Sequence, residues 1–170
     1  MMEPKVSMTA LILAGGKSLG KEAVLEDLAG MTAALFDETF IIASLNRNYK
    51  HLNLHGAAVL TDFLENKGPL VGLYTGLSYS THQVSCVLTC DLPLVSPTIL
   101  QRLVDSWQEE YDGICLEDIE GRVQPFPGIY RRSSRHFIRL LLDRGENTMS
   151  RLLDVLVIRS LPIDRPVPSL

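Results

Sequence analysis

The chain has 170 residues, which is long enough for one domain with a sizeable core and short for two. Hydrophobic residues make up 46% and charged residues 21%, a balance typical of a globular protein and not of a disordered or fibrous chain. The net charge of −4 leaves no broad basic face for nucleic acid, and no apolar run approaches the roughly 20 residues of a membrane span. We therefore expect a single domain over residues 1–170 that binds neither nucleic acid nor a membrane.

Apolar strand patterns alternate with helical patterns along the first two thirds of the chain. The strand patterns cover residues 9–14, 39–43, 57–61 and 85–89, and the helical patterns cover residues 21–35 and 69–79 and a stretch that begins at Pro97. Such alternation is typical of a parallel sheet with helices on both faces. The predicted fold class is therefore α/β, a single-domain Rossmann-like fold with a mostly parallel sheet.

The regular alternation of strand and helix patterns ends after Gly113. Short strand patterns at residues 114–116 and 122–124 flank a polar segment, which predicts a hairpin. Helices are expected over residues 133–144 and 150–153, and a last strand over residues 155–160. The pairs Glu109-Glu110 and Arg131-Arg132 are expected on solvated faces.

The three cysteines, Cys86, Cys90 and Cys115, are odd in number and lack the spacing of paired zinc ligands. Buried thiols in a reducing compartment explain such residues better than disulfides do. We therefore expect a cytoplasmic protein.

The segment Leu13-Ala14-Gly15-Gly16-Lys17-Ser18 ends the first strand in a glycine loop. Glycines let the backbone adopt positive φ and approach a bulky anion, and the amides of such a loop can bind phosphate. The loop is neither a P-loop, which would need glycine where Leu11 stands, nor a dinucleotide fingerprint, because Lys17 stands where the second glycine should be. It predicts a phosphate site of another kind, the alternative being a tight turn without a ligand.

Polar residues follow the other predicted strands. Asn46 comes after the second, Asp62 after the third and Asp91 after the fourth. In an open parallel sheet, ligands bind at the carboxyl ends of the strands. Asp91 is the strongest candidate, because a single carboxylate can bind Mg²⁺ whose other ligands are water and phosphate. The alternative is that Asp91 only caps a turn through its side chain.

Four motifs together resemble the molybdenum cofactor guanylyltransferase family of the NTP-transferase superfamily. They are Leu-Ala-Gly-Gly-Lys-Ser at 13–18, Gly-Pro-Leu-x-Gly at 68–72, Cys-Asp-Leu-Pro at 90–93 and Gly-Ile-Tyr-Arg-Arg at 128–132. The likeness runs from about residue 9 to residue 160 in the same order. The first motif alone is shared with many sugar-phosphate nucleotidyltransferases, whereas the combination is more specific.

The resemblance implies an enzyme that transfers GMP from GTP to molybdopterin or the molybdenum cofactor and releases pyrophosphate. It implies Mg²⁺ as cofactor, with Asp91 as the metal-binding and catalytic residue. Its partners would be the two substrates and other proteins of cofactor biosynthesis or molybdoenzyme chaperones. The nucleotide-binding residues that it implies are Leu13, Ala14, Gly15, Gly16, Asn46, Asp62, Gly68, Pro69 and Asp91. A Gly15-Gly16 pair favours guanine over cytosine, on the same resemblance.

One departure from the family concerns the basic segment that follows the glycine loop. The family has Arg-Met-Gly-x-Asp-Lys there, whereas Ser18 is followed directly by Leu19-Gly20-Lys21. We expect a basic loop of about a dozen residues between Ser18 and Leu19 in the natural protein, the alternative being that this loop is truly deleted. Lys21 is expected to begin the following helix and not to replace the missing lysine.

Two alternatives to the guanylyltransferase function stay open. One is a cytidylyl- or sugar-phosphate nucleotidyltransferase, and the other, in another class, is a non-catalytic nucleotide- or partner-binding domain.

Overall fold

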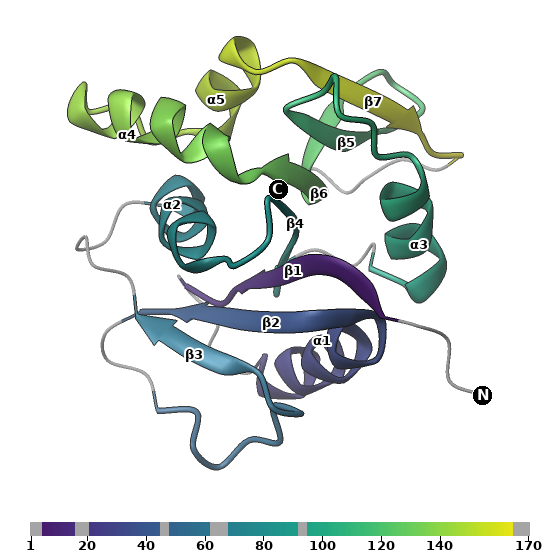
Figure 1. Ribbon diagram of the computed structural model, residues 1–170, viewed down its shortest axis with the longest axis vertical. Coiled ribbons are helices and arrows are strands. Elements are labelled where there is room, and N and C mark those ends of the chain that lie inside the picture. The colour runs from purple at the N-terminus through teal and green to yellow at the C-terminus, as the bar shows by residue number, and fades with distance from the viewer. Residues whose placement is uncertain (1–4, 16–20, 45–47, 62–67, 92–94, 165–170) are drawn as a thin grey trace.

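The computed structural model describes residues 5–15, 21–44, 48–61, 68–91 and 95–164. Within these residues the strands are β1 (Val6–Leu13), β2 (Phe36–Ala43), β3 (Ala58–Thr61), β4 (Val84–Thr89), β5 (Gly113–Glu117), β6 (Val123–Arg131) and β7 (Ile158–Pro162). They form one sheet in the order β3-β2-β1-β4-β6-β5-β7 (Figure 1). Only β6 runs antiparallel to its neighbours. The predicted mostly parallel α/β fold is confirmed.

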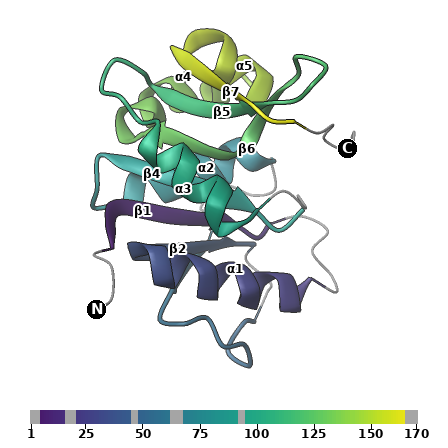
Figure 2. The ribbon, with the colours of Figure 1, turned by 90° about the vertical axis from the view of Figure 1, so that its right-hand side faces the viewer.

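Helices cover both faces of the sheet. They are α1 (Glu22–Leu35), α2 (Pro69–Tyr79), α3 (Pro97–Asp105), α4 (Arg135–Asp143) and α5 (Met149–Val155), with a short 3₁₀ turn, η1 (Arg132–Ser134), before α4. Helices α1 and α3 pack on one face, and α2, α4 and α5 pack on the other (Figure 2). No helix in the described part of the chain has the length and apolar character needed to cross a membrane.

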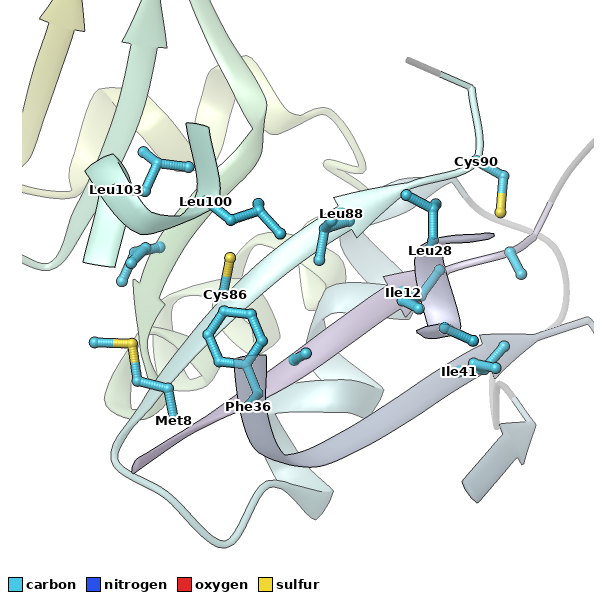
Figure 3. Packing of buried hydrophobic residues seen from close by; sticks show 14 of the residues in the cluster. Met8, Ile12, Leu28, Phe36, Ile41, Cys86, Leu88, Cys90, Leu100 and Leu103 are labelled. Atoms are coloured by element: carbon cyan, nitrogen blue, oxygen red, sulfur yellow. The ribbon is translucent and has the colours of Figure 1, made fainter. Parts of the chain in front are cut away.

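The core on the face of α1 and α3 is built from alternate residues of the central strands. Ile12 and Leu88 point toward Leu28 of α1, and Cys86 lies beneath Leu100 of α3 (Figure 3). The three cysteines are free and buried, as predicted. Burial raises the pKa of the Cys86 thiol to about 12, so this residue is an inert apolar group at neutral pH.

The opposite core holds α2 very close to the sheet. A Cβ atom on Gly76 would lie 2.7 Å from Leu11 Cδ1 of β1, a separation that side chains do not tolerate. Gly76 therefore has a packing role, which explains a glycine inside a helix where it costs about 1 kcal/mol relative to alanine. The helix begins at Pro69 and ends at Tyr79, the bounds that the sequence predicts.

The segment after Gly113 forms the predicted hairpin of β5 and β6. Its turn is organised by Asp118, whose side chain is fully buried. The carboxylate accepts hydrogen bonds from the amides of Glu120 and Arg122, each at 2.9 Å, and from Arg122 Nε at 2.8 Å. Strand β6 continues to Arg131, well past the predicted strand pattern at residues 122–124.

The expectation that Arg131 lies on a solvated face is wrong. Its guanidinium carbon lies 5.3 Å from the centre of the Trp107 ring, and Nη1 pairs with Glu109 Oε2 at 3.0 Å. Nη2 also donates to the carbonyl oxygen of Tyr111 at 2.9 Å. The side chain, 23% exposed, ties β6 to the segment after α3, so this part of the Gly-Ile-Tyr-Arg-Arg motif is structural.

A polar cluster joins the strands at the amino end of the sheet. Glu38 of β2 accepts hydrogen bonds from Thr9 Oγ1 at 2.6 Å and from the amide and hydroxyl of Thr81 at 3.1 and 2.9 Å. His82 lies 3.0 Å from the Thr9 hydroxyl. Burial alone would raise the pKa of Glu38, but these hydrogen bonds and the charge of His82 lower it below its ordinary value of 4.5.

The Glu38→Gln variant should lose about 1 kcal/mol of unfolding free energy at neutral pH, because a neutral amide accepts these hydrogen bonds less strongly. A carboxyl whose pKa is lowered on folding stabilises the fold above its unfolded pKa and ceases to do so as the pH falls through its folded pKa. The difference between wild type and variant should therefore shrink below about pH 4.5. Urea unfolding of both proteins over a pH series measures this difference. If the difference in unfolding free energy between the two proteins were the same at every pH, the charged Glu38 carboxylate would not be the source of the stabilisation.

Candidate active site

Strands β1 and β4 lie side by side at the point where the order of the sheet reverses. Strand β1 pairs with β2 on one side and with β4 on the other, and Leu13 stands opposite Thr89. Gly15 and Asp91 each follow this pair by two residues, and the Cys90 amide donates to the Leu13 carbonyl oxygen at 3.4 Å. The two candidate residues thus emerge beside each other at a topological switch point, where open α/β sheets bind ligands.

The end of β1 offers backbone and not side chains to a ligand. Leu13 and Ala14 are 7% and 1% exposed, and the Ala14 amide donates to the Ile42 carbonyl oxygen at 2.8 Å. The hydroxyl of Tyr49 donates to the carbonyl oxygen of Ala14 at 3.4 Å. These contacts fix the strand end from which the loop begins.

Gly15 itself is not in a left-handed conformation, so for this residue the expected positive φ is wrong. A Cβ atom placed on it would lie 3.6 Å from Ser44 Oγ, which is an ordinary contact. Neither backbone strain nor crowding by the described protein atoms therefore requires a glycine here. That a ligand approaches the backbone here stays a prediction from the sequence.

Asp91 forms an ion pair that the sequence argument missed. The Lys21 ammonium contacts Asp91 Oδ1, and the two side chains are 36% and 48% exposed. Lys21 immediately precedes α1 and so begins the helix, as predicted. Since α1 follows β1, it starts at the same edge of the sheet at which β4 ends. That topological relation was the one signal in the sequence that could have placed Lys21 beside Asp91.

The neighbouring Cys90 is not a nucleophile. Burial, together with the negative charge of Asp91, raises the pKa of its thiol to about 11, although Lys21 acts in the opposite direction. The thiol is therefore protonated at neutral pH, whereas nucleophilic attack needs the thiolate.

The motif at 68–72 begins α2 at the same edge of the sheet. Gly68 has a φ of +80°, which only glycine adopts without strain, and Pro69 occupies the first turn, where its missing amide costs nothing. A Cβ on Gly68 would lie 3.5 Å from the carbonyl oxygen of Asn147. The segment before α5 therefore lies against the start of α2.

Several predicted residues lie outside the described residues: Gly16, Asn46 and Asp62, and also Ser18 and Leu19, between which a basic loop is expected. Their roles stay predictions. Of the described candidates, the structure brings Leu13, Ala14 and Gly15 to the end of β1 and Asp91 to the end of the adjacent strand. Gly68 and Pro69 lie at the start of α2.

The donor set around Asp91 suits a cation that takes most of its ligands from elsewhere. Among the described residues, no three His, Cys, Asp or Glu side chains gather in a way that could hold a metal. Asp91 is half exposed, and its carboxylate already contacts one cation, the Lys21 ammonium. A lone carboxylate with room for water and phosphate oxygens matches the preferences of Mg²⁺ and not those of a structural metal site.

Comparison with known proteins identifies the family of this chain. The MobA-like NTP transferase domain matches residues 10–160. A Flavobacterium johnsoniae protein named a probable molybdenum cofactor guanylyltransferase is 28% identical over 158 residues, covering 86% of this chain and 80% of its own.

Two solved structures show the same fold. Molybdopterin-guanine dinucleotide biosynthesis protein A of Archaeoglobus fulgidus has a TM-score of 0.68 and 18% identity, covering 91% of this chain and 83% of its own. A Mycobacterium tuberculosis protein in complex with manganese has a TM-score of 0.73 and 20% identity, covering 96% and 91%. At these identities the structures show the fold alone, whereas the domain match spans most of the sequence. The chain belongs to the MobA-like NTP transferase family and is a nucleotidyltransferase enzyme.

Proposed function

We propose that the enzyme transfers GMP from GTP to the phosphate of molybdopterin and releases pyrophosphate. The observation that carries this proposal is the adjacency of the Gly15 backbone, the Asp91 carboxylate and the Lys21 ammonium at the switch point of the sheet. A loop for phosphate, an acid for a metal and a fixed positive charge are what transfer from a nucleoside triphosphate requires. The printed name of the Flavobacterium relative supports guanine and the molybdenum cofactor as the substrates.

The reaction needs no covalent enzyme intermediate. An oxygen of the acceptor phosphate attacks the α-phosphorus of GTP in line, and the bond to the β-phosphate oxygen breaks. The backbone at Gly15 binds phosphate oxygens. Lys21 at the start of α1 offsets negative charge, which a helix N-terminus also favours; its contact with Asp91 is the reason for giving it this role, which the sequence alone did not assign to it. The buried, protonated thiol of Cys90 agrees with direct transfer.

Asp91 is the residue that would hold Mg²⁺. When bound there, the ion supplies neutralisation of phosphate charge and a fixed orientation of the triphosphate. The manganese in the Mycobacterium tuberculosis structure supports a divalent metal in this fold. The acidic side chain is free to turn from Lys21 to a metal, because both partners are at least one third exposed and such ion pairs hold weakly.

Measuring pyrophosphate release with each of the four nucleoside triphosphates tests the substrate assignment. With molybdopterin as acceptor and Mg²⁺ present, GTP should support release and CTP should not. A preference for CTP, or transfer to a sugar phosphate in place of molybdopterin, would favour the alternative nucleotidyltransferases. Membership of an enzyme family argues against the non-catalytic alternative.

Replacing Lys21 by Met should weaken GTP binding about tenfold, because a positive charge next to the phosphate loop is lost. The free energy of unfolding should change by less than about 1 kcal/mol, since the ion pair with Asp91 is exposed. Calorimetric titration with GTP and thermal melting measure the two effects. Lys21→Arg, which keeps the charge, is the control. Equal GTP affinity in wild type and Lys21→Met would remove Lys21 from the site.

A further inference from the structure

The hydroxyl of Thr89 is buried without a hydrogen-bond partner in the part of the chain that the structure describes. Thr89 is the last residue of β4 and is 8% exposed. A buried hydroxyl that makes no hydrogen bond destabilises the folded protein, and proteins rarely keep one without a reason. Its place two residues before Asp91 suggests that the missing partner belongs to a ligand.

The register of the sheet fixes the direction of this side chain. Residues that stand opposite each other on neighbouring strands point to the same face, and Leu13 stands opposite Thr89. Leu13 packs in the core beneath α2, as does Val87, two residues earlier on the same strand. Thr89 therefore points to the face of α2, whereas Lys21 immediately precedes α1, which packs on the other face.

Two further groups lie on this face at the carboxyl edge. Helix α2 starts there, with Gly68 as its N-cap and no side chain capping its free amides. The segment before α5 is the second, since the carbonyl oxygen of Asn147 lies against Gly68. The uncapped start of an eleven-residue helix and an unpaired buried hydroxyl thus lie on the same face of the sheet.

The strand order indicates which substrate takes this position. Apart from Asp91, the residues expected to hold the nucleotide follow β1, β2 and β3 or begin α2, which packs on β1 and β2, and these elements lie on one side of β4. Thr89 belongs to β4, whose other neighbour is β6. The nucleotide and the acceptor must meet at Asp91, so the half of the edge from β4 toward β6 is left for the acceptor.

We propose that the Thr89 hydroxyl binds the second substrate, by a hydrogen bond to a polar atom next to the phosphate that receives the nucleotidyl group. The proposal rests on the proposed function and names a residue for its acceptor. Thr89 and Asp91 are separated by one residue of the turn that follows β4, so this contact lies close to a phosphate at Asp91. The acceptor class is a phosphorylated organic molecule with a hydrogen-bonding group close to its phosphate.

Thr89→Val tests the assignment, because it keeps the shape of the side chain and removes the hydroxyl. The KM for the acceptor should rise about tenfold, while the Kd for GTP stays unchanged. The melting temperature should rise, since an unpaired polar group is removed from the free protein. Thr89→Ser, which keeps the hydroxyl, should restore the acceptor KM.

Thr39→Val is a matched control. Thr39 on β2 also has a hydroxyl without a partner among the described residues, but it pairs with Ala10, three residues before the end of β1. This variant should gain thermal stability and keep the acceptor KM. An unchanged acceptor KM in Thr89→Val, or a rise in the Kd for GTP in its place, would overturn the assignment. Failure of the wild-type enzyme to transfer GMP to molybdopterin would instead overturn the proposed function. In that case the role of Thr89 can still be tested without turnover, by comparing the shift in melting temperature that the acceptor causes in wild type and in Thr89→Val.

Discussion

Asp91→Asn will slow nucleotidyl transfer by orders of magnitude while the protein stays folded. The amide has the same shape as the carboxylate but lacks the charge that binds Mg²⁺. Asp91 is 48% exposed and its ion pair with Lys21 is weak, so the stability effect should be below about 1 kcal/mol. Turnover at saturating GTP, measured across a Mg²⁺ titration, should show both a lower kcat and a higher metal requirement.

The control for this variant is Asp143→Asn on α4. Asp143 is 55% exposed and pairs with Arg139 at 3.0 Å, so it resembles Asp91 in exposure and in having a cationic partner. It lies on a helix whose residues take no part in the site, and its variant should keep full activity. Near wild-type turnover of Asp91→Asn at limiting Mg²⁺ would remove Asp91 from the metal site.

The order of elements could be predicted because local signals were strong. Ser96 caps α3 by accepting a hydrogen bond from the Ile99 amide at 3.2 Å, as its place before Pro97 indicates. Boundaries were predicted less well where tertiary pairing extends a strand. β6 runs to Arg131 because it pairs with both β4 and β5, and neither pairing can be read from its own residues.

The sequence could predict only those residues of the candidate site that directly follow a predicted strand. Gly15 and Asp91 follow apolar runs, so their meeting at one edge follows from a parallel sheet. Their ion-pair and hydrogen-bond partners could not be predicted in the same way. The contact of Lys21 with Asp91 spans 70 positions, and the contacts of Arg131 depend on a loop that precedes another strand. An unpaired hydroxyl such as that of Thr89 is visible only once its surroundings are known.

Gly15→Val will abolish GTP binding with little change in melting temperature. The structure leaves room for a Cβ on Gly15, since Ser44 Oγ would lie 3.6 Å away, so the protein itself should accept a side chain. A phosphate on the backbone would collide with that side chain. Gly15→Ala should give a smaller loss of affinity in the same direction, and calorimetry with GTP measures both variants.

Gly76→Ala provides the opposite pattern and so separates binding from folding. Its Cβ would lie 2.7 Å from Leu11 Cδ1, which forces α2 away from β1 and should lower the melting temperature. Gly76 lies in the second half of α2, away from the ligand edge where the helix starts, so the folded variant should bind GTP as the wild type does. The pair of variants therefore predicts affinity loss without destabilisation at Gly15 and destabilisation without affinity loss at Gly76. Unchanged GTP affinity in Gly15→Val would mean that the glycine loop is only a turn.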